Sequence, residues 1–129
     1  MYFKNLSVDH LNMTVNNLND STSWYKKYFG FKIVEEGKGW NIIKSSSLMI
    51  CQYETNYKIP QESKDIHKIF HFGLRISDKT SWEKVLDIEK FELFYNSPIT
   101  YPNSTSWYIK DPSGHEIEVV YWNNDSIKF

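Results

Sequence analysis

The sequence predicts an α+β fold of two paired βαβββ modules, which form a curved mixed sheet around a cavity with the helices on its outer face. The main observation is an internal repeat. In each half, an alternating strand with a histidine at its start leads into a helix that begins Thr-Ser-Trp-x-Lys. Three short β-rich segments then follow each helix. Since neither half can bury a sheet face alone, we expect a single domain over residues 1–129.

The strands of the first module, placed at about residues 5–54, are short and separated by turn residues. The first strand, at about 6–15, has an apolar face and a polar face that carries His10 and Asn12. Three further strands follow the helix, joined by Gly-Lys-Gly and Ser-Ser-Ser turns. These three strands are expected at 31–35, 40–44 and 48–53.

Both helices carry start and stop signals. In the first helix, Asp20 or Ser21 can accept a hydrogen bond from a free backbone N–H, and Gly30 ends the helix. In the second helix, Asp78 is the expected cap, and the helix runs to about Glu89. Both helices should therefore pack as short, well-defined elements against the sheet.

The second module, placed at about residues 70–122, follows a polar connector at about 55–69 that shows no periodicity. The sequence Asp-Pro-Ser-Gly at 111–114 predicts a tight turn between the last two strands. Residues 97–104, which contain two prolines, are expected to form a loop. The strands of this module are expected at 70–76, 91–95, 105–110 and 115–122.

Composition excludes several classes of function. The 129 residues include 15 basic and 16 acidic ones, so the net charge is −1 and we expect no nucleic-acid partner. No stretch is long and apolar enough for a membrane span or a signal peptide, so we expect no membrane partner. Cys51 is the single cysteine and forms no disulfide within the chain, which suits a reducing compartment. We therefore expect a cytoplasmic protein.

Two histidines and one carboxylate can face the cavity together. His10 and His71 start equivalent strands of the repeat, and Glu118 interrupts an otherwise apolar last strand. This set suits divalent Fe, Mn, Zn or Ni and leaves coordination positions open for substrate or water. A lone strand histidine is more often packed or exposed, and the repeat is what favours the metal interpretation. His67 and His115 are weaker candidates, expected to be exposed.

Four segments of the chain resemble the vicinal oxygen chelate superfamily, which includes glyoxalase I, bleomycin-resistance proteins, fosfomycin-resistance enzymes and extradiol dioxygenases. The resemblance spans nearly the whole chain in the right order. It implies paired βαβββ modules, a divalent metal held by His10, His71 and Glu118, and a homodimer. The segments are residues 9–15 (DHLNMTV), 23–31 (SWYKKYFGF), 71–74 (HFGL) and 108–118 (YIKDPSGHEIE).

Departures from the family pattern indicate which functions of the family this chain resembles most. Glyoxalase I carries a fourth ligand, usually glutamate, where this chain has Cys51, the counterpart of Glu118. A cysteine can ligate a soft metal or fill a small apolar position. The three-ligand pattern is more similar to the fosfomycin-resistance enzymes, which often have threonine at the position of Asn12, or to the dioxygenases. Candidates for the tyrosine that dioxygenases use are Tyr53, Tyr95 and Tyr101.

Two functions remain open. The first is a metal-dependent lyase, transferase or dioxygenase, in which the ion chelates adjacent oxygens of a small substrate and Tyr53 or Glu116 transfers a proton. The second is a metal-free protein that binds a small molecule or an antibiotic in an aromatic crevice between subunits. The first is favoured because all three ligand types are present. Residues expected to line the cavity are Asn12, Trp40, Cys51, Arg75, Trp107 and Trp122, with Tyr108 as a further aromatic wall.

Overall fold

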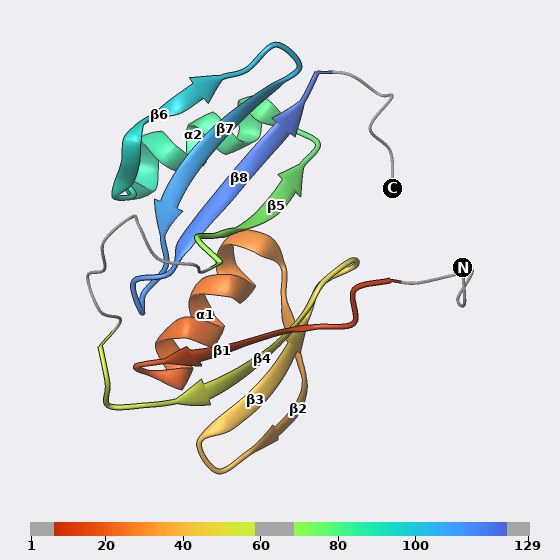
Figure 1. Cartoon of the computed structure of the whole chain (residues 1–129), viewed down its shortest axis with the longest axis vertical. Coiled ribbons are helices and arrows are strands. Elements are labelled where there is room, and N and C mark those ends of the chain that lie inside the picture. The colour runs from red at the N-terminus through yellow and green to blue at the C-terminus, as the bar shows by residue number, and fades with distance from the viewer. Residues whose placement is uncertain (1–6, 59–68, 124–129) are drawn as a thin grey trace. The chain divides into compact units, whose positions relative to one another are not determined.

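The computed structural model describes residues 7–58 and 69–123, which form two compact units, and each unit is described by itself (Figure 1). Both units have the order strand, helix, strand, strand, strand, so the predicted βαβββ modules of an α+β fold are confirmed. Residues 59–68 of the predicted connector, which include His67, lie outside the described residues. A single domain with one curved sheet and a shared cavity stays a prediction.

The first unit is a four-stranded mixed sheet with one helix. Its strand order is β1-β4-β3-β2, in which β1 pairs parallel with β4 and the other pairs are antiparallel. The parallel register places Asn12 opposite Cys51. The elements are β1 (Leu11–Val15), α1 (Leu18–Phe29), β2 (Lys32–Gly37), β3 (Trp40–Lys44) and β4 (Met49–Glu54).

The second unit repeats this arrangement. Its strand order is β5-β8-β7-β6, again with the first and last strands parallel, and Gly73 lies opposite Glu118. The predicted turn between β7 and β8 is present, because the Gly114 N–H donates to the Asp111 carbonyl over 3.0 Å. The elements are β5 (Phe72–Ile76), α2 (Lys79–Glu89), β6 (Leu93–Thr100), β7 (Ser104–Lys110) and β8 (Glu116–Trp122).

The two helices begin at capping side chains and end at left-handed residues. Asp78 caps α2 as predicted, whereas the cap of α1 is Asn17 rather than Asp20 or Ser21. The Asn17 side chain accepts from the backbone N–H of Asp20 over 2.9 Å. Gly30 ends α1 as predicted, with φ 69°. Neither helix of the described part is long and apolar enough to cross a membrane.

The repeated Thr-Ser-Trp sequence occupies different positions in the two helices. Counted from the caps Asn17 and Asp78, Trp24 is seven residues along α1 and Trp82 is four residues along α2. The helical position of Trp82 is therefore filled by Ser21 in the first unit. The structural repeat lies in the strands, the caps and the two histidines, and the literal sequence repeat is shifted by one helical turn.

Strand β6 continues through the segment that the sequence predicts as a loop, so that prediction is wrong for residues 97–100. The pairing of β6 with β7 shifts between Phe94 and Ile99, and Tyr95 and Asn96 have left-handed φ values of 59° and 52°. Such a bulge leaves backbone groups unpaired, and Pro98, which lacks an N–H, fits this stretch of the edge strand.

The helix-facing side of each sheet holds the core. In the second unit, Trp107 is 1% exposed, pairs with Val119, and its ring lies 6.5 Å from that of Trp82 in α2. The prediction that Trp107 lines the cavity is therefore wrong, because strand alternation turns it toward the helix, away from Glu118.

The first unit has hydrogen-bonded polar groups at the equivalent core positions. Asn41 and Gln52 face α1, and Gln52 is fully buried. The Gln52 amide donates to the Ser21 hydroxyl over 2.7 Å and accepts from the Thr22 hydroxyl over 3.2 Å. The Asn41 amide donates to the same Thr22 hydroxyl over 2.7 Å. These bonds connect β3 and β4 to the second turn of α1.

Replacing Gln52 with leucine should destabilise the protein. The substitution leaves the buried Ser21 hydroxyl without its partner, and an unsatisfied buried polar group costs about 1–3 kcal/mol. The free energy of unfolding, measured by urea denaturation, should fall by that amount. The double variant Gln52→Leu/Ser21→Ala should recover part of the loss, since both polar partners are then absent. Equal stability of wild type and Gln52→Leu would contradict the network.

Asp78 should make the stability of the protein depend on acid pH. Hydrogen bonds from the Ser81 side chain and the Ser81 backbone N–H lower the pKa of Asp78 below its ordinary value of 3.8. The ionised cap therefore stabilises the fold above that pH, and this contribution is lost as the pH falls through the lowered pKa.

The Asp78→Asn variant keeps a capping oxygen but has no such titration. Thermal melting should show that wild type loses more stability than Asp78→Asn between neutral pH and a pH below 3.8. The reciprocal control is Asn17→Asp, which places an aspartate at the equivalent cap of α1 and should add acid dependence. Parallel pH profiles for wild type and Asp78→Asn would count against this account.

Candidate functional site

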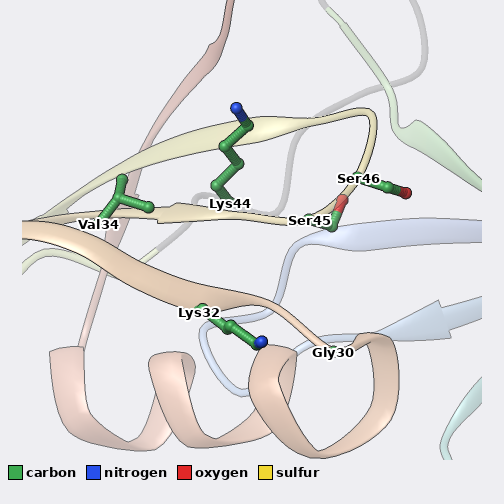
Figure 2. A pocket seen from close by; sticks show the side chains of 6 residues that line it. All are labelled: Gly30, Lys32, Val34, Lys44, Ser45 and Ser46. Atoms are coloured by element: carbon green, nitrogen blue, oxygen red, sulfur yellow. The ribbon is translucent and has the colours of Figure 1, made fainter.

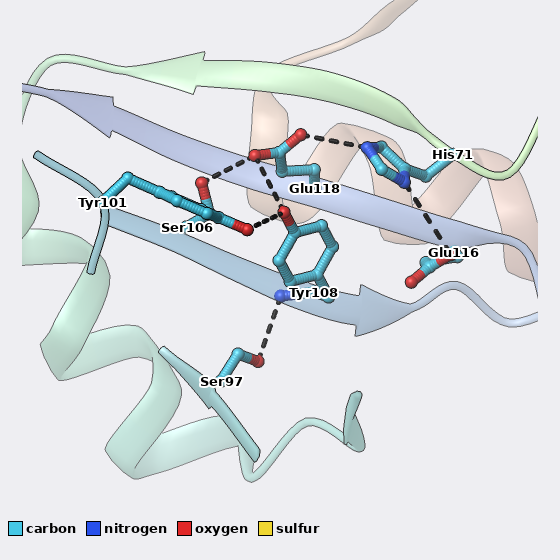
Figure 3. Close-up of polar contacts among 7 residues, drawn as sticks. All are labelled: His71, Ser97, Tyr101, Ser106, Tyr108, Glu116 and Glu118. Atoms are coloured by element: carbon cyan, nitrogen blue, oxygen red, sulfur yellow. Dashed lines mark hydrogen bonds and ion pairs between the residues drawn. The ribbon is translucent and has the colours of Figure 1, made fainter. Parts of the chain in front are cut away.

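The structure brings His71 and Glu118 together on the face of the second sheet that points away from α2. His71 immediately precedes β5, and Glu118 lies in the neighbouring strand β8, opposite Gly73. The distance between His71 Nε2 and Glu118 Oε2 is 3.1 Å (Figure 3). Both side chains are partly accessible, at 32% and 20% exposure. The pair is therefore formed but open to a ligand.

Hydroxyl groups hold the second oxygen of Glu118. The Ser106 hydroxyl donates to Oε1 over 2.6 Å and the Tyr108 hydroxyl over 3.4 Å (Figure 3). The Tyr108 hydroxyl also lies 3.1 Å from that of Tyr101. The carboxylate is thus oriented by its Oε1 contacts, so that Oε2 is directed at His71.

Glu116 approaches the other nitrogen of His71. Its Oε2 lies 3.8 Å from His71 Nδ1, and its side chain is 12% exposed (Figure 3). The other oxygen, Oε1, is buried and has no hydrogen-bond partner among the described residues. The imidazole therefore lies between two carboxylates, one at each ring nitrogen.

Two tyrosines beside these carboxylates stay protonated at neutral pH. Burial, the hydrogen bond with Tyr101 and the charge of Glu118 raise the pKa of Tyr108 well above its usual range. The pKa of Tyr95 is also raised, mainly by a hydrogen bond with Glu116 and to a smaller extent by burial and by the charge of that carboxylate. Both hydroxyls are therefore hydrogen-bond donors, and the Tyr95 and Tyr108 rings meet edge to face at 5.3 Å.

His10 has a similar arrangement in the first unit. It immediately precedes β1, is 44% exposed, and its Nδ1 lies 2.6 Å from Asp9 Oδ2. A carboxylate at Nδ1 favours the tautomer that leaves Nε2 free to ligate an ion. His10 and His71 thus share their strand position and a carboxylate near Nδ1, while a common site for them with Glu118 stays a prediction.

The other predicted residues lie on the two sheets as follows. In the first unit, Asn12 and Cys51 are register partners on the face opposite α1, as are Trp40 and Tyr53. Tyr53 is 45% exposed. In the second unit, the Arg75 guanidinium lies 5.7 Å from the centre of the Trp122 ring.

The His71–Glu118 pair fits a divalent ion. Two ligands at right angles and about 2.1 Å from one ion lie about 3 Å apart, close to the 3.1 Å between Nε2 and Oε2. A nitrogen and a carboxylate oxygen are also donors that Zn, Fe, Mn and Ni accept. Within residues 7–58 and 69–123, no group of three or more His, Cys, Asp or Glu side chains is arranged so that all of them could hold one metal ion. The third ligand therefore stays a prediction.

Sequence reasoning missed the part that Ser106 has in holding Glu118 and named Tyr108 as an aromatic wall only. The predicted four-residue turn at 111–114 would pair Tyr108 with Ile117, one residue away from the observed register. In the structure the connection covers residues 111–115, so Lys110 pairs with Glu116 and Tyr108 with Glu118, and Ser106 lies on the same face. The hydroxyls around the carboxylate therefore depend on one extra residue in the connection, which the turn motif alone does not specify.

Solved structures share this fold at low sequence identity. A lactoylglutathione lyase from Agrobacterium tumefaciens has a TM-score of 0.66 and 19% identity, over 89% of this chain and 92% of that chain. A protein from the mobile metagenome of V. Pseudocholerae has a TM-score of 0.66 and 21% identity, over 96% and 100%. A glyoxalase/bleomycin resistance protein/dioxygenase from Alicyclobacillus acidocaldarius has a TM-score of 0.68 and 16% identity, over 95% and 96%.

Sequence comparison gives the family directly. No curated protein sequence matches the chain. A family model does match, over residues 7–119, and its description agrees with the resemblance in the motifs around His10, His71 and Glu118. Because the match covers most of the chain, this protein belongs to the Glyoxalase/Bleomycin resistance protein/Dioxygenase superfamily.

Proposed function

We propose that this protein is a metal-dependent enzyme that acts on a small, oxygen-rich substrate, with a divalent ion held by His10, His71 and Glu118. The observation that carries the proposal is the 3.1 Å approach of His71 Nε2 to Glu118 Oε2, on a carboxylate whose other oxygen is held by hydroxyls. When bound, such an ion supplies Lewis acidity to adjacent substrate oxygens. Superfamily membership supports this general class of chemistry.

The surrounding residues have separate roles in this proposal. Ser106 and Tyr108 fix Glu118, so that one carboxylate oxygen remains for the ion. Glu116 has a buried oxygen without a hydrogen-bond partner in the described chain, so it is our first choice for the group that accepts a substrate proton. Tyr53, exposed on the first sheet, is the alternative.

We assign substrate contacts to the face of each sheet that lies opposite its helix. In the second unit, the Arg75 guanidinium, 5.7 Å from the centre of the Trp122 ring, offers a cation beside an aromatic surface. In the first unit, Trp40, Asn12 and Cys51 lie on the face opposite α1. We also propose a cytoplasmic homodimer with no nucleic-acid or membrane partner, on the family resemblance, the neutral charge balance and the single cysteine.

Metal binding can be tested on protein purified without a histidine tag and freed of metal with a chelator. Titration with Zn, Mn, Fe or Ni should give about one ion per chain and raise the melting temperature. His10→Ala, His71→Ala and Glu118→Gln should each weaken binding by more than about 10-fold, because each removes a proposed ligand.

The matched control is His115→Ala, which removes a histidine of the same unit that is outside the proposed set and should leave the affinity unchanged. Elemental analysis gives the stoichiometry, and competition with a chromophoric chelator gives the affinity. If wild type binds none of the four ions at micromolar concentration, or if all variants bind as wild type does, the metal-dependent function is wrong.

The second candidate is metal-free binding of a small aromatic molecule. The observation that favours it is the group of tyrosines beside Glu118, in which Tyr95 and Tyr101 are 53% and 41% exposed next to the buried Tyr108. Tight binding of an aromatic molecule that a chelator does not alter, with the molecule recovered intact, would identify this function. Turnover that requires the ion would exclude it.

A further inference from the structure

One pair of facing side chains differs in charge between the two units. In the second unit, Lys110 ends β7 and its ammonium lies 3.5 Å from Glu92, just before β6. In the first unit, Lys44 ends β3 and its register partner on β2 is Lys32. The positions correspond, because the next pair along is Leu93 with Ile109 in one unit and Ile33 with Ile43 in the other. The first unit thus has two lysines where the second unit has an ion pair.

Lys32 and Lys44 have no counter-ion among the residues that the structure describes. Residues directly opposite on antiparallel strands lie on one face, and like charges there repel each other. Within the described chain, neither Lys32 nor Lys44 forms an ion pair. In Figure 2 their side chains extend away from one another, as expected for unpaired ammonium groups. Two more lysines, Lys26 and Lys27, lie in the last turn of α1 and add positive charge to this end of the unit.

An open cavity of about 370 Å³ lies beside this lysine pair (Figure 2). Ser45 and Ser46 add hydroxyl groups, and Gly30 has no side chain to fill the space. The Ser45 backbone N–H and the Ser45 hydroxyl both donate to the Leu48 carbonyl, over 2.9 and 3.5 Å, which fixes the turn that carries both serines. Ammonium and hydroxyl groups are hydrogen-bond donors suited to an oxyanion. The lining residues are Gly30, Lys32, Val34, Lys44, Ser45 and Ser46.

We propose that this cavity binds the phosphate group of a small molecule, with the Lys32 and Lys44 ammonium groups as counter-ions and the Ser46 hydroxyl as a further donor. The bound anion takes the place that the Glu92 carboxylate has in the second unit. The cavity exceeds the size of one phosphate, so the remainder of the molecule has room beside Val34. None of the residues proposed to hold or surround the metal ion belongs to this site.

The test uses inorganic phosphate as the probe, with chelator present so that the metal site stays empty. Melting temperature and isothermal titration are measured at constant ionic strength, with sodium chloride replaced stepwise by phosphate. Wild type should show saturable binding and a rise in melting temperature. Lys32→Glu copies the Lys110–Glu92 pair, so it should weaken phosphate binding at least 10-fold and raise the melting temperature measured without phosphate.

The matched control is Glu92→Lys, which creates a like-charge pair in the second unit. It should lower the melting temperature and leave phosphate affinity unchanged. Acetate at the same ionic strength tests a carboxylate ligand, and a response equal to that of phosphate overturns the phosphate assignment. A response to phosphate no larger than that to chloride, or one that Lys32→Glu leaves intact, overturns the site.

Discussion

The parallel pairing of the first and last strand in each module is the constraint on which the candidate site depends. Parallel strands need a crossover connection, and here the helix and two further strands supply it. In the second unit, this register places Gly73 opposite Glu118, so the residue two positions earlier, His71, reaches the carboxylate at the start of β5. A slip by one residue would turn Glu118 toward α2.

Features determined by neighbouring residues could be predicted from the sequence, whereas those that depend on distant pairing could not. Gly30, Asp78 and the 111–114 turn were predicted because a left-handed stop, a helix cap and a Pro-Gly turn need few residues to specify them. The β6 bulge was missed because pairing with β7 outweighs the local preference of proline for loops. Strand alternation gave the faces of His71 and Glu118, but Trp107 was assigned to the wrong face.

The two modules share a backbone arrangement and differ in what their sheets carry. Against the helices, the first unit buries hydrogen-bonded Asn41 and Gln52 where the second packs Trp107 and Val119. The helices differ in the same way, because Ser21 of α1 occupies the position that Trp82 has in α2. On the opposite face, Cys51 stands where the second unit has Glu118. In the core, the sheet and the helix differ together: polar sheet residues face a serine in the first unit, and apolar sheet residues face a tryptophan in the second. Each module therefore pairs side chains of matching size and polarity.

The contacts of Glu118 are formed over very different stretches of chain. Its hydroxyl partners are 12 and 10 residues away, within one hairpin, whereas His71 is 47 residues away. Loop-closure entropy grows with the logarithm of loop length, so the histidine contact costs roughly 1.2 kcal/mol more to close than the serine contact. We therefore expect the hairpin to orient the carboxylate early in folding, and the histidine to join it when β5 docks. A ligand shared by both groups then holds this 47-residue closure together, and its binding energy stabilises the module as a whole.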